Sequence, residues 1–408
     1  MFKLPRNKNP SFSNSFNPCV FPMLERPFQF FSSLRLTVVL LAIATVLVFV
    51  GTLAQVEEGL YLAQNRYFKS FLIFWTPGNS SIQIPILPGG YTVGTLLLIN
   101  LVAAHVKRFE FTRKKAGIFL THIGIVLLLV GQLATDMLST ESALRFNEGE
   151  TKNYSEDFHA NELVIIDTSD ADKDHVMSIP DGRLRPGAEI RHERLPFTLQ
   201  VLEFWPNSDL FSQSTNGTLE VRASQGVGVG LHLLPRPITT KMDERNLPSA
   251  LVRITAGGQD LGTWLVSSML SRKQVLTHGS KTYSLALRFK RHYTPYSMTL
   301  LDADNEYYVG TKKPKHFSSR VRIEHTESKE NRESLIYMNN PLRYQGLTYY
   351  QFQMGTGEGG LGQSSTLQVV RNPSWLTPYL GCVIVAAGLT LQFMIHLVGF
   401  ATRRKEAA

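Results

Sequence analysis

The sequence predicts a membrane protein with four transmembrane α-helices and a large extracytoplasmic all-β domain. Two observations support this prediction. Four apolar runs of about the length that crosses a bilayer occupy residues 36–54, 91–106, 116–135 and 375–401. Between the third and fourth runs, residues 136–374 contain many short segments in which apolar and polar side chains alternate, as they do in half-buried strands.

The distribution of charge predicts the orientation of these runs. The formal net charge is +9. Residues 1–35 carry five basic and one acidic side chain, the loop 107–115 carries the same, and the tail 402–408 carries three and one. These three segments hold the whole basic excess, so the positive-inside rule places all three in the cytoplasm. The basic excess therefore indicates the topology of the chain in the lipid bilayer, and we expect no nucleic-acid partner.

The segments around the first three spans follow from this layout. Residues 1–35 form a cytoplasmic tail, and Arg35 anchors the span 36–54. The outer loop 55–90 contains the aromatic-rich stretch EEGLYLAQNRYFKSFLIFW, which predicts an interfacial helix before PILPGG breaks the chain. The spans 91–106 and 116–135 then form a hairpin around the basic loop 107–115.

The domain at 136–374 is expected to be a β-sandwich or a barrel-like fold. Segments such as FTLQVLEF, LVRITA, KTYSLALRF and STLQVVR alternate in polarity and are separated by Gly, Asn, Asp and Pro. The chain has two cysteines, Cys19 and Cys382, and both lie outside this domain, so its fold needs no disulfide.

The stretch NNPLRYQGLTYYQFQM predicts two turns and a strand. Asn340-Pro341 should start the first turn, Gly346 should lie in or near the second, and residues 348–354 should form the strand. The simpler interpretation is a hairpin of the β core. The functional alternative places Tyr350 and Gln351 against a partner protein.

Common catalytic motifs are absent from the sequence. No Gly-rich phosphate loop, HExxH, GxSxG, CxxC or CxxCH occurs. Eight histidines of the middle domain lack metal-ligand spacing, and we expect them to be solvated surface residues: His159, His175, His192, His232, His278, His292, His316 and His325.

Three further histidines lie in the apolar runs: His105, His122 and His396. His122 lies about six residues, or about 9 Å, inside its span, where an ionisable side chain is costly and is a functional candidate by default. His105 and His396 lie near the cytoplasmic ends of their spans, where a helix-capping or interfacial role is an alternative. Neutral imidazoles on facing helices are ordinary axial ligands of haem iron. Two of the three could therefore hold a haem b between spans, with His122 as one ligand and His105 or His396 as the second. The alternative role for His122 is a hydrogen bond to a neighbouring span.

Gly117, Gly124 and Gly131 recur every seven residues on the span that carries His122. This row of small residues permits close approach either of a flat macrocycle or of another helix.

Four stretches resemble one known family. They are FSSLRLTVVLLAIATVLVFVGTLAQ, AGIFLTHIGIVLLLVGQLAT, LRFNEGET and MNNPLRYQGLTYYQFQM, in that order along the chain. Together they resemble ResB (also called CcsB), the membrane component of System II cytochrome c maturation. The resemblance implies a multi-pass protein of the bacterial cytoplasmic (inner) membrane with its large domain on the periplasmic face.

The resemblance also implies partners and roles. The chain would be a non-autonomous subunit of a haem lyase (synthase), moving haem outward with a CcsA-like haem-handling membrane protein and supporting haem attachment to CxxCH of apocytochrome c. His122 matches the hairpin-span histidine that is implicated in haem binding in the family, so haem b would be bound transiently. Because no dithiol is present, a separate thiol-disulfide reductant is also implied.

Two alternatives remain open at this point. One is a b-type electron-transfer membrane protein with a bis-histidine haem. The other is a membrane-anchored assembly domain without a cofactor.

Overall fold

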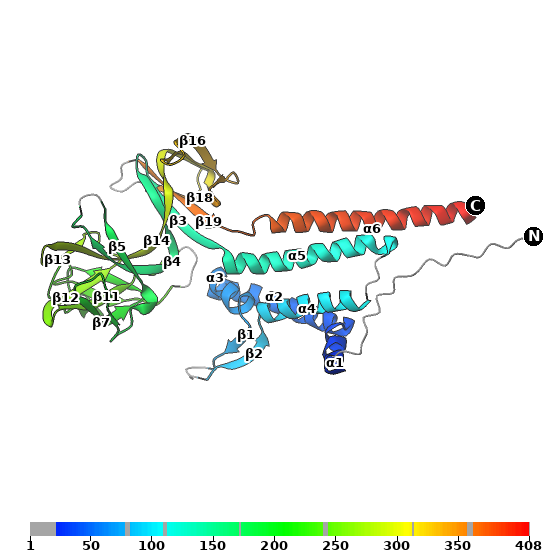
Figure 1. Cartoon of the computed structure of the whole chain (residues 1–408), viewed down its shortest axis with the longest axis horizontal. Helices are drawn as coiled ribbons and strands as arrows, with labels where there is room; N and C mark the ends of the chain where they lie inside the picture. Colours follow the sequence, from blue (N-terminus) through cyan, green and yellow to red (C-terminus); the bar gives the residue numbers. More distant parts are fainter. Residues whose placement is uncertain are drawn as a thin grey trace, which may run out of the picture. The chain divides into compact units, whose positions relative to one another are not determined.

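The computed structural model describes residues 22–77, 82–108, 112–170, 173–239, 244–311, 314–356 and 362–407 (Figure 1). Residues 1–21 of the expected cytoplasmic tail, including Cys19, lie outside the described residues, as do residues 109–111 of the basic loop and Ala408. The chain divides into two compact units, one of residues 1–132 with 376–408 and the other of residues 133–375. Each unit is considered by itself.

The first unit is built from helices: α1 (Pro22–Phe31), α2 (Leu34–Glu58), α3 (Leu60–Ala63), α4 (Gly90–Arg108), α5 (Ala116–Leu138) and α6 (Thr377–Ala407). Four of them, α2, α4, α5 and α6, are long and apolar enough to cross a membrane. Large apolar side chains are exposed on their surfaces, for example Phe49 at 64% and Phe393 at 65%. A helix satisfies its own backbone hydrogen bonds, so such a surface is stable in lipid. These helices indicate a membrane protein and confirm the predicted fold class for this unit.

The loop between α2 and α4 holds less helix than the sequence suggested. The chain forms α3, a π-helical turn η1 (Gln64–Phe68), and then an antiparallel pair, β1 (Leu72–Trp75) and β2 (Ile84–Pro88). Ile73 is buried and packs with Leu47, Ala63 and Tyr67. Pairing with β2 satisfies the backbone of residues 72–75, and this tertiary contact outweighs the local helical preference.

Helices α5 and α6 are in close contact along the glycine row of α5. A Cβ atom added at Gly117 would lie 2.6 Å from the Gly388 carbonyl oxygen, and one at Gly124 would lie 3.0 Å from the Gly381 carbonyl oxygen. A Cβ at Gly131 would clash with the Thr377 side chain. The row therefore serves helix–helix packing, which is one of the two readings that the sequence left open.

In the second unit the described residues form three antiparallel sheets. The largest has ten strands: β3 (Thr140–Asn147), β4 (Thr151–Asp167), β5 (His175–Pro180), β13 (Gln274–His278), β14 (Lys281–Tyr307), β15 (Pro314–His325), β16 (Glu330–Tyr337), β17 (Leu342–Tyr344), β18 (Leu347–Thr356) and β19 (Gln363–Arg371). The second has four: β6 (Glu189–Ile190), β7 (Thr198–Trp205), β11 (Ser249–Ala256) and β12 (Gln259–Ser267). The third has three: β8 (Ser208–Phe211), β9 (Leu219–Glu220) and β10 (His232–Pro235).

This unit has two main hydrophobic cores. One lies between the four-stranded sheet and part of the ten-stranded sheet, where Val252 and Leu285 are fully buried. The other lies inside the remainder of the ten-stranded sheet, which curls into a nearly closed antiparallel barrel around residues such as Met298 and Leu367. Strand β14 contributes to both cores because it is 27 residues long. The predicted large β-rich region is confirmed.

The NNPLRYQGLTYYQFQM stretch folds as the β-core hairpin that the simpler interpretation predicted. Strands β17 and β18 pair across a turn at Gln345 and Gly346, whose φ angles are 49° and 75°. Tyr349 is buried, and its hydroxyl lies 2.7 Å from that of Tyr296. Burial raises the pKa of the Tyr349 phenol, so this pair stays neutral and hydrogen-bonded inside the barrel.

Candidate functional site

The structure brings two of the three predicted membrane histidines together. His105 lies near the C-terminal end of α4, and His122 lies in the second turn of α5. Their ring centroids are 4.5 Å apart and the ring planes are inclined at 53°. The two residues come from consecutive helices, His105 close to the end of α4 and His122 close to the start of α5.

A hydrogen bond to the backbone defines the tautomer of each ring. His105 Nδ1 lies 3.2 Å from the Leu101 carbonyl oxygen, and His122 Nδ1 lies 2.7 Å from the Ile118 carbonyl oxygen. A carbonyl oxygen only accepts, so Nδ1 carries the hydrogen in both rings. In a neutral imidazole the lone pair then resides on Nε2, the nitrogen that binds a metal when Nδ1–H is held by a carbonyl.

This donor set fits haem iron better than a bare metal ion. Among the described residues no group of three or more His, Cys, Asp or Glu side chains is placed to hold a metal ion. Haem iron receives its equatorial ligands from the porphyrin and needs only one or two axial ligands from the protein. Two neutral imidazoles within apolar helices supply these ligands without burying a charged side chain.

The spacing of the two rings limits how both could bind one iron. Imidazole nitrogens on opposite faces of a metal lie about 4 Å apart, because each metal–nitrogen bond is about 2 Å. The centroids of such rings are farther apart still, whereas those of His105 and His122 are separated by 4.5 Å. Coordination of one iron by both rings would therefore require the rings to move apart.

His396 is engaged elsewhere. It lies on α6, and its Nε2 accepts a hydrogen bond from Gln392 Nε2 at 2.9 Å. Gln392 also accepts from the Ile118 amide at 3.2 Å and donates to the Lys114 carbonyl oxygen at 3.3 Å. The lone pair of His396 Nε2 thus belongs to a polar link between α6 and the start of α5.

The two residues predicted to face a partner differ in their surroundings. Tyr350 is 38% exposed on β18. Gln351 points to the other side of the strand, where its Oε1 accepts from Ser319 Oγ at 2.7 Å and its Nε2 donates to Ser365 Oγ at 3.2 Å. Tyr350 is accordingly the better candidate for an external contact, and the Gln351 amide is used inside the barrel.

Two polar residues were not foreseen. Asn100 is 1% exposed in the middle of α4, where its Nδ2 donates to the carbonyl oxygens of Phe31 and Ser33 at 2.6 and 3.1 Å. A lone Asn within an apolar run was the available signal. His325 was expected to be solvated, and this is wrong: it is 8% exposed and stacks on Tyr296. The sequence around His325 is charged and gives no signal that Tyr296, which is distant in the chain, packs against it.

Comparisons with known proteins agree with this architecture. Residues 261–362 match the model of the ResB-like family. Protein NrfI of Wolinella succinogenes is 24% identical over 296 residues, which are 72% of this chain and 29% of NrfI. This chain therefore spans less than a third of the length of that relative. Residues 261–362 thus carry a match to the ResB-like family, and the chain is a distant homologue of NrfI.

Proposed function

We propose that this protein is a haem-handling membrane subunit in cytochrome c biogenesis, acting with a CcsA-like partner to deliver haem for covalent attachment to CxxCH of apocytochrome c. The observation that carries the proposal is the pair formed by His105 and His122, with both Nδ1 atoms held by backbone carbonyls. The match of residues 261–362 to the ResB-like family supports it independently.

In this proposal His122 would hold a transiently bound haem b through Nε2, and the Ile118 carbonyl orients its ring for this role. His105 would be the second ligand, and His396 stays with Gln392. Haem supplies the iron and the vinyl groups that attachment to thiols needs.

The proposal includes a reductant and a protein partner. Thioether formation requires reduced thiols, and this sequence contains no pair of neighbouring cysteines that cycles between dithiol and disulfide. A separate thiol-disulfide reductant is therefore part of the proposal. The chain acts as a non-autonomous subunit of the synthase, with Tyr350 on the exposed side of β18 as a contact for a partner.

The proposed orientation places the basic segment 107–115 in the cytoplasm and the β-rich unit on the periplasmic side of the inner membrane. The clustering of positive charge at 1–35, 107–115 and 402–408 supports it. Reporter fusions that are active on only one side of the membrane should give opposite signals at Lys115 and at Asp170. Equal signals at the two positions would contradict this layout.

The function is tested by removing the chain from its host. Membranes of the deletion strain should retain b-type haem but lose covalently attached haem in c-type cytochromes, while apocytochrome is still made. Restoring the gene should restore the covalent haem. Normal holocytochrome c in the deletion strain would overturn the proposal. If the purified protein also shows a reversible haem midpoint potential coupled to quinone, the b-type electron-transfer alternative is the better assignment.

A further inference from the structure

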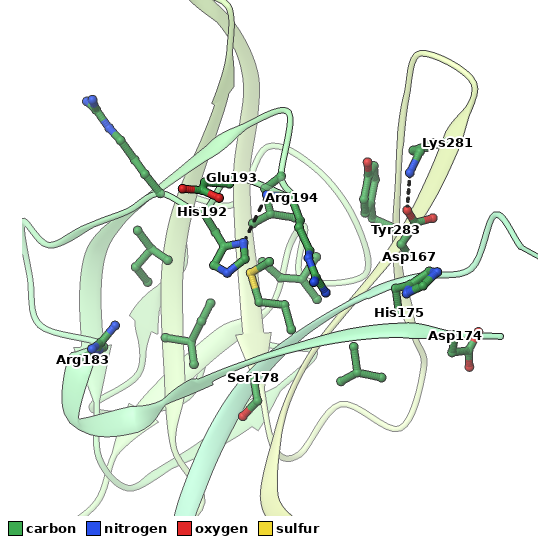
Figure 2. A pocket seen from close by; sticks show the side chains of 17 residues that line it. Asp167, Asp174, His175, Ser178, Arg183, His192, Glu193, Arg194, Lys281 and Tyr283 are labelled. Carbon is green, nitrogen blue, oxygen red and sulfur yellow. Dashed lines mark hydrogen bonds and ion pairs between the residues drawn. The ribbon is translucent and has the colours of Figure 1, made fainter.

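The β-rich unit contains a cavity of about 1090 Å³ that the haem-handling proposal does not use (Figure 2). Most of its lining comes from two segments that are distant from the histidine pair in sequence, strand β5 and residues 190–195. The volume is slightly above the range of about 300–1,000 Å³ found for small-molecule sites, so it is large enough for an extended ligand.

The lining residues show that the cavity follows the edge of strand β5. Five consecutive residues of β5, His175 to Ile179, line it, and so do all six residues from Ile190 to Leu195. Neighbouring residues of a strand point to opposite faces of the sheet, so a cavity lying on one face would touch only alternate residues. This cavity therefore runs along the edge of β5, opposite the end of β6. Strand β5 lies at an edge of the ten-stranded sheet, and β6 is the edge strand of the four-stranded sheet.

The edge of β5 that faces the cavity is open for pairing. All six residues of β5 pair with β4, and no second partner strand of β5 occurs among the described residues. Natural edge strands are commonly guarded by charged side chains, as β16 is by Glu330, Arg332 and Glu333. Strand β5 has the sequence HVMSIP, with no Lys, Arg, Asp or Glu, and its proline is the last residue.

Hydrogen-bond donors and apolar groups face one another across the cavity. Figure 2 shows His192 and Arg194 extending toward the strand that carries His175 and Ser178. The Arg194 amide donates to His192 Nδ1 at 3.2 Å, so a neutral His192 carries its hydrogen on Nε2 and acts there as a donor. Apolar side chains of the neighbouring core complete the lining: Ile165, Met177, Ile179, Ile190 and Leu195.

The charged groups of the lining are in part already paired. Lys281 bonds to Asp167 at 2.7 Å, and Arg191 bonds to Glu189 at 2.7 Å. The hydrogen bond from Lys281 keeps the pKa of Asp167 at about 2, so this pair is ionised at neutral pH. Arg183 and Arg194 are balanced by Asp174 and Glu193 in the same lining, which gives the cavity no strong preference for an anion or a cation.

We propose that this cavity binds an extended polypeptide segment, which adds as a further strand along the edge of β5. An added strand satisfies the outward N–H and C=O groups of β5, and the donors of His192 and Arg194 meet its carbonyls or side chains. Alternate side chains of the peptide enter the apolar space beside Met177 and Ile179. A strand that matches the six residues of β5 is about 20 Å long.

The identity of the peptide rests on the proposed function, which makes the haem-attachment region of an unfolded apocytochrome c the natural occupant. His192 presents an N–H on Nε2 and uses its Nδ1 lone pair for the Arg194 amide, so neither nitrogen of this histidine is available to iron. The two proposals therefore assign haem to the helices and the polypeptide to the β-rich unit.

The test measures binding of a fluorescent twelve-residue peptide to the purified full-length chain in detergent. The peptide carries the haem-attachment sequence with serine in place of its two cysteines. Val176→Lys places a charge on the β5 edge at a side chain that is 47% exposed, and it should weaken binding at least ten-fold. Val275→Lys is the matched control, since Val275 is 55% exposed on β13 and lies outside the cavity lining, and it should leave the dissociation constant unchanged.

A second measurement does not depend on any variant folding. Methylating alternate backbone nitrogens of the peptide removes the donors that pair with a strand edge, so the methylated peptide should bind the wild-type chain at least ten-fold more weakly. His122→Ala should bind the unmodified peptide normally, which separates this proposal from the haem assignment. Absence of saturable binding up to about 1 mM, or equal binding by Val176→Lys or by the methylated peptide, would overturn the polypeptide site.

Discussion

His122→Ala should reduce the haem that co-purifies with the complex of this chain and its CcsA-like partner on the order of ten-fold or more. The reason is that His122 Nε2 is the proposed axial ligand, and alanine offers iron no replacement in an apolar helix. Bound haem is measured by its Soret absorption and by extraction, and covalent haem in cytochrome c is measured in the same cells. Added imidazole should restore part of both signals, because it fills the vacated coordination position.

Two further variants compare the other membrane histidines with His122. His105→Ala should shift the haem spectrum and lower haem content less severely, since it removes the second ligand and leaves the first. His396→Ala should retain haem, because its Nε2 already accepts from Gln392. Unchanged haem and cytochrome c in His122→Ala would show that the ligand assignment is mistaken. Loss of the protein itself would instead reveal a structural role for the imidazole.

Gly117→Leu should strongly destabilise the packing of α5 against α6 in the helical unit. A Cβ atom at this position would lie 2.6 Å from the backbone nitrogen of Gln392 and 2.6 Å from the Gly388 carbonyl oxygen. Backbone atoms of a packed helix cannot rotate away as a side-chain end does, so α5 and α6 must separate. We expect a loss of about 3 kcal/mol or more in the free energy of unfolding, at the upper end of overpacking costs.

The measurement is resistance to unfolding by a denaturing detergent, followed by circular dichroism. Gly94→Leu is the matched control, since Gly94 lies in the span helix α4 and a Cβ added there meets no atom within 4 Å. The control should unfold at the same detergent concentration as the wild-type protein. Equal stability of Gly117→Leu and Gly94→Leu would mean that α5 and α6 are not in the close contact described above.

Much of the architecture was predictable because its signals are local. Apolar runs long enough for a bilayer give the four helices, and period-two alternation gives the β-rich unit, since both patterns reflect what each segment must bury or expose. The interfacial helix expected in the outer loop was too long, because its prediction used composition and not the pairing of segments. Composition alone does not reveal that Ile73 is buried or that residues 72–75 pair with Ile84–Pro88.

The sequence by itself determined that three histidines lie in apolar runs and that glycines recur along one of them. Only the tertiary structure decided that His122 meets His105 while His396 meets Gln392, and that the glycines receive α6. It alone also placed the β5 edge beside residues 190–195. The physical reason is the same throughout. Periodicity and composition record the environment of each residue, whereas the identity of its neighbour depends on how segments far apart in the chain pack together.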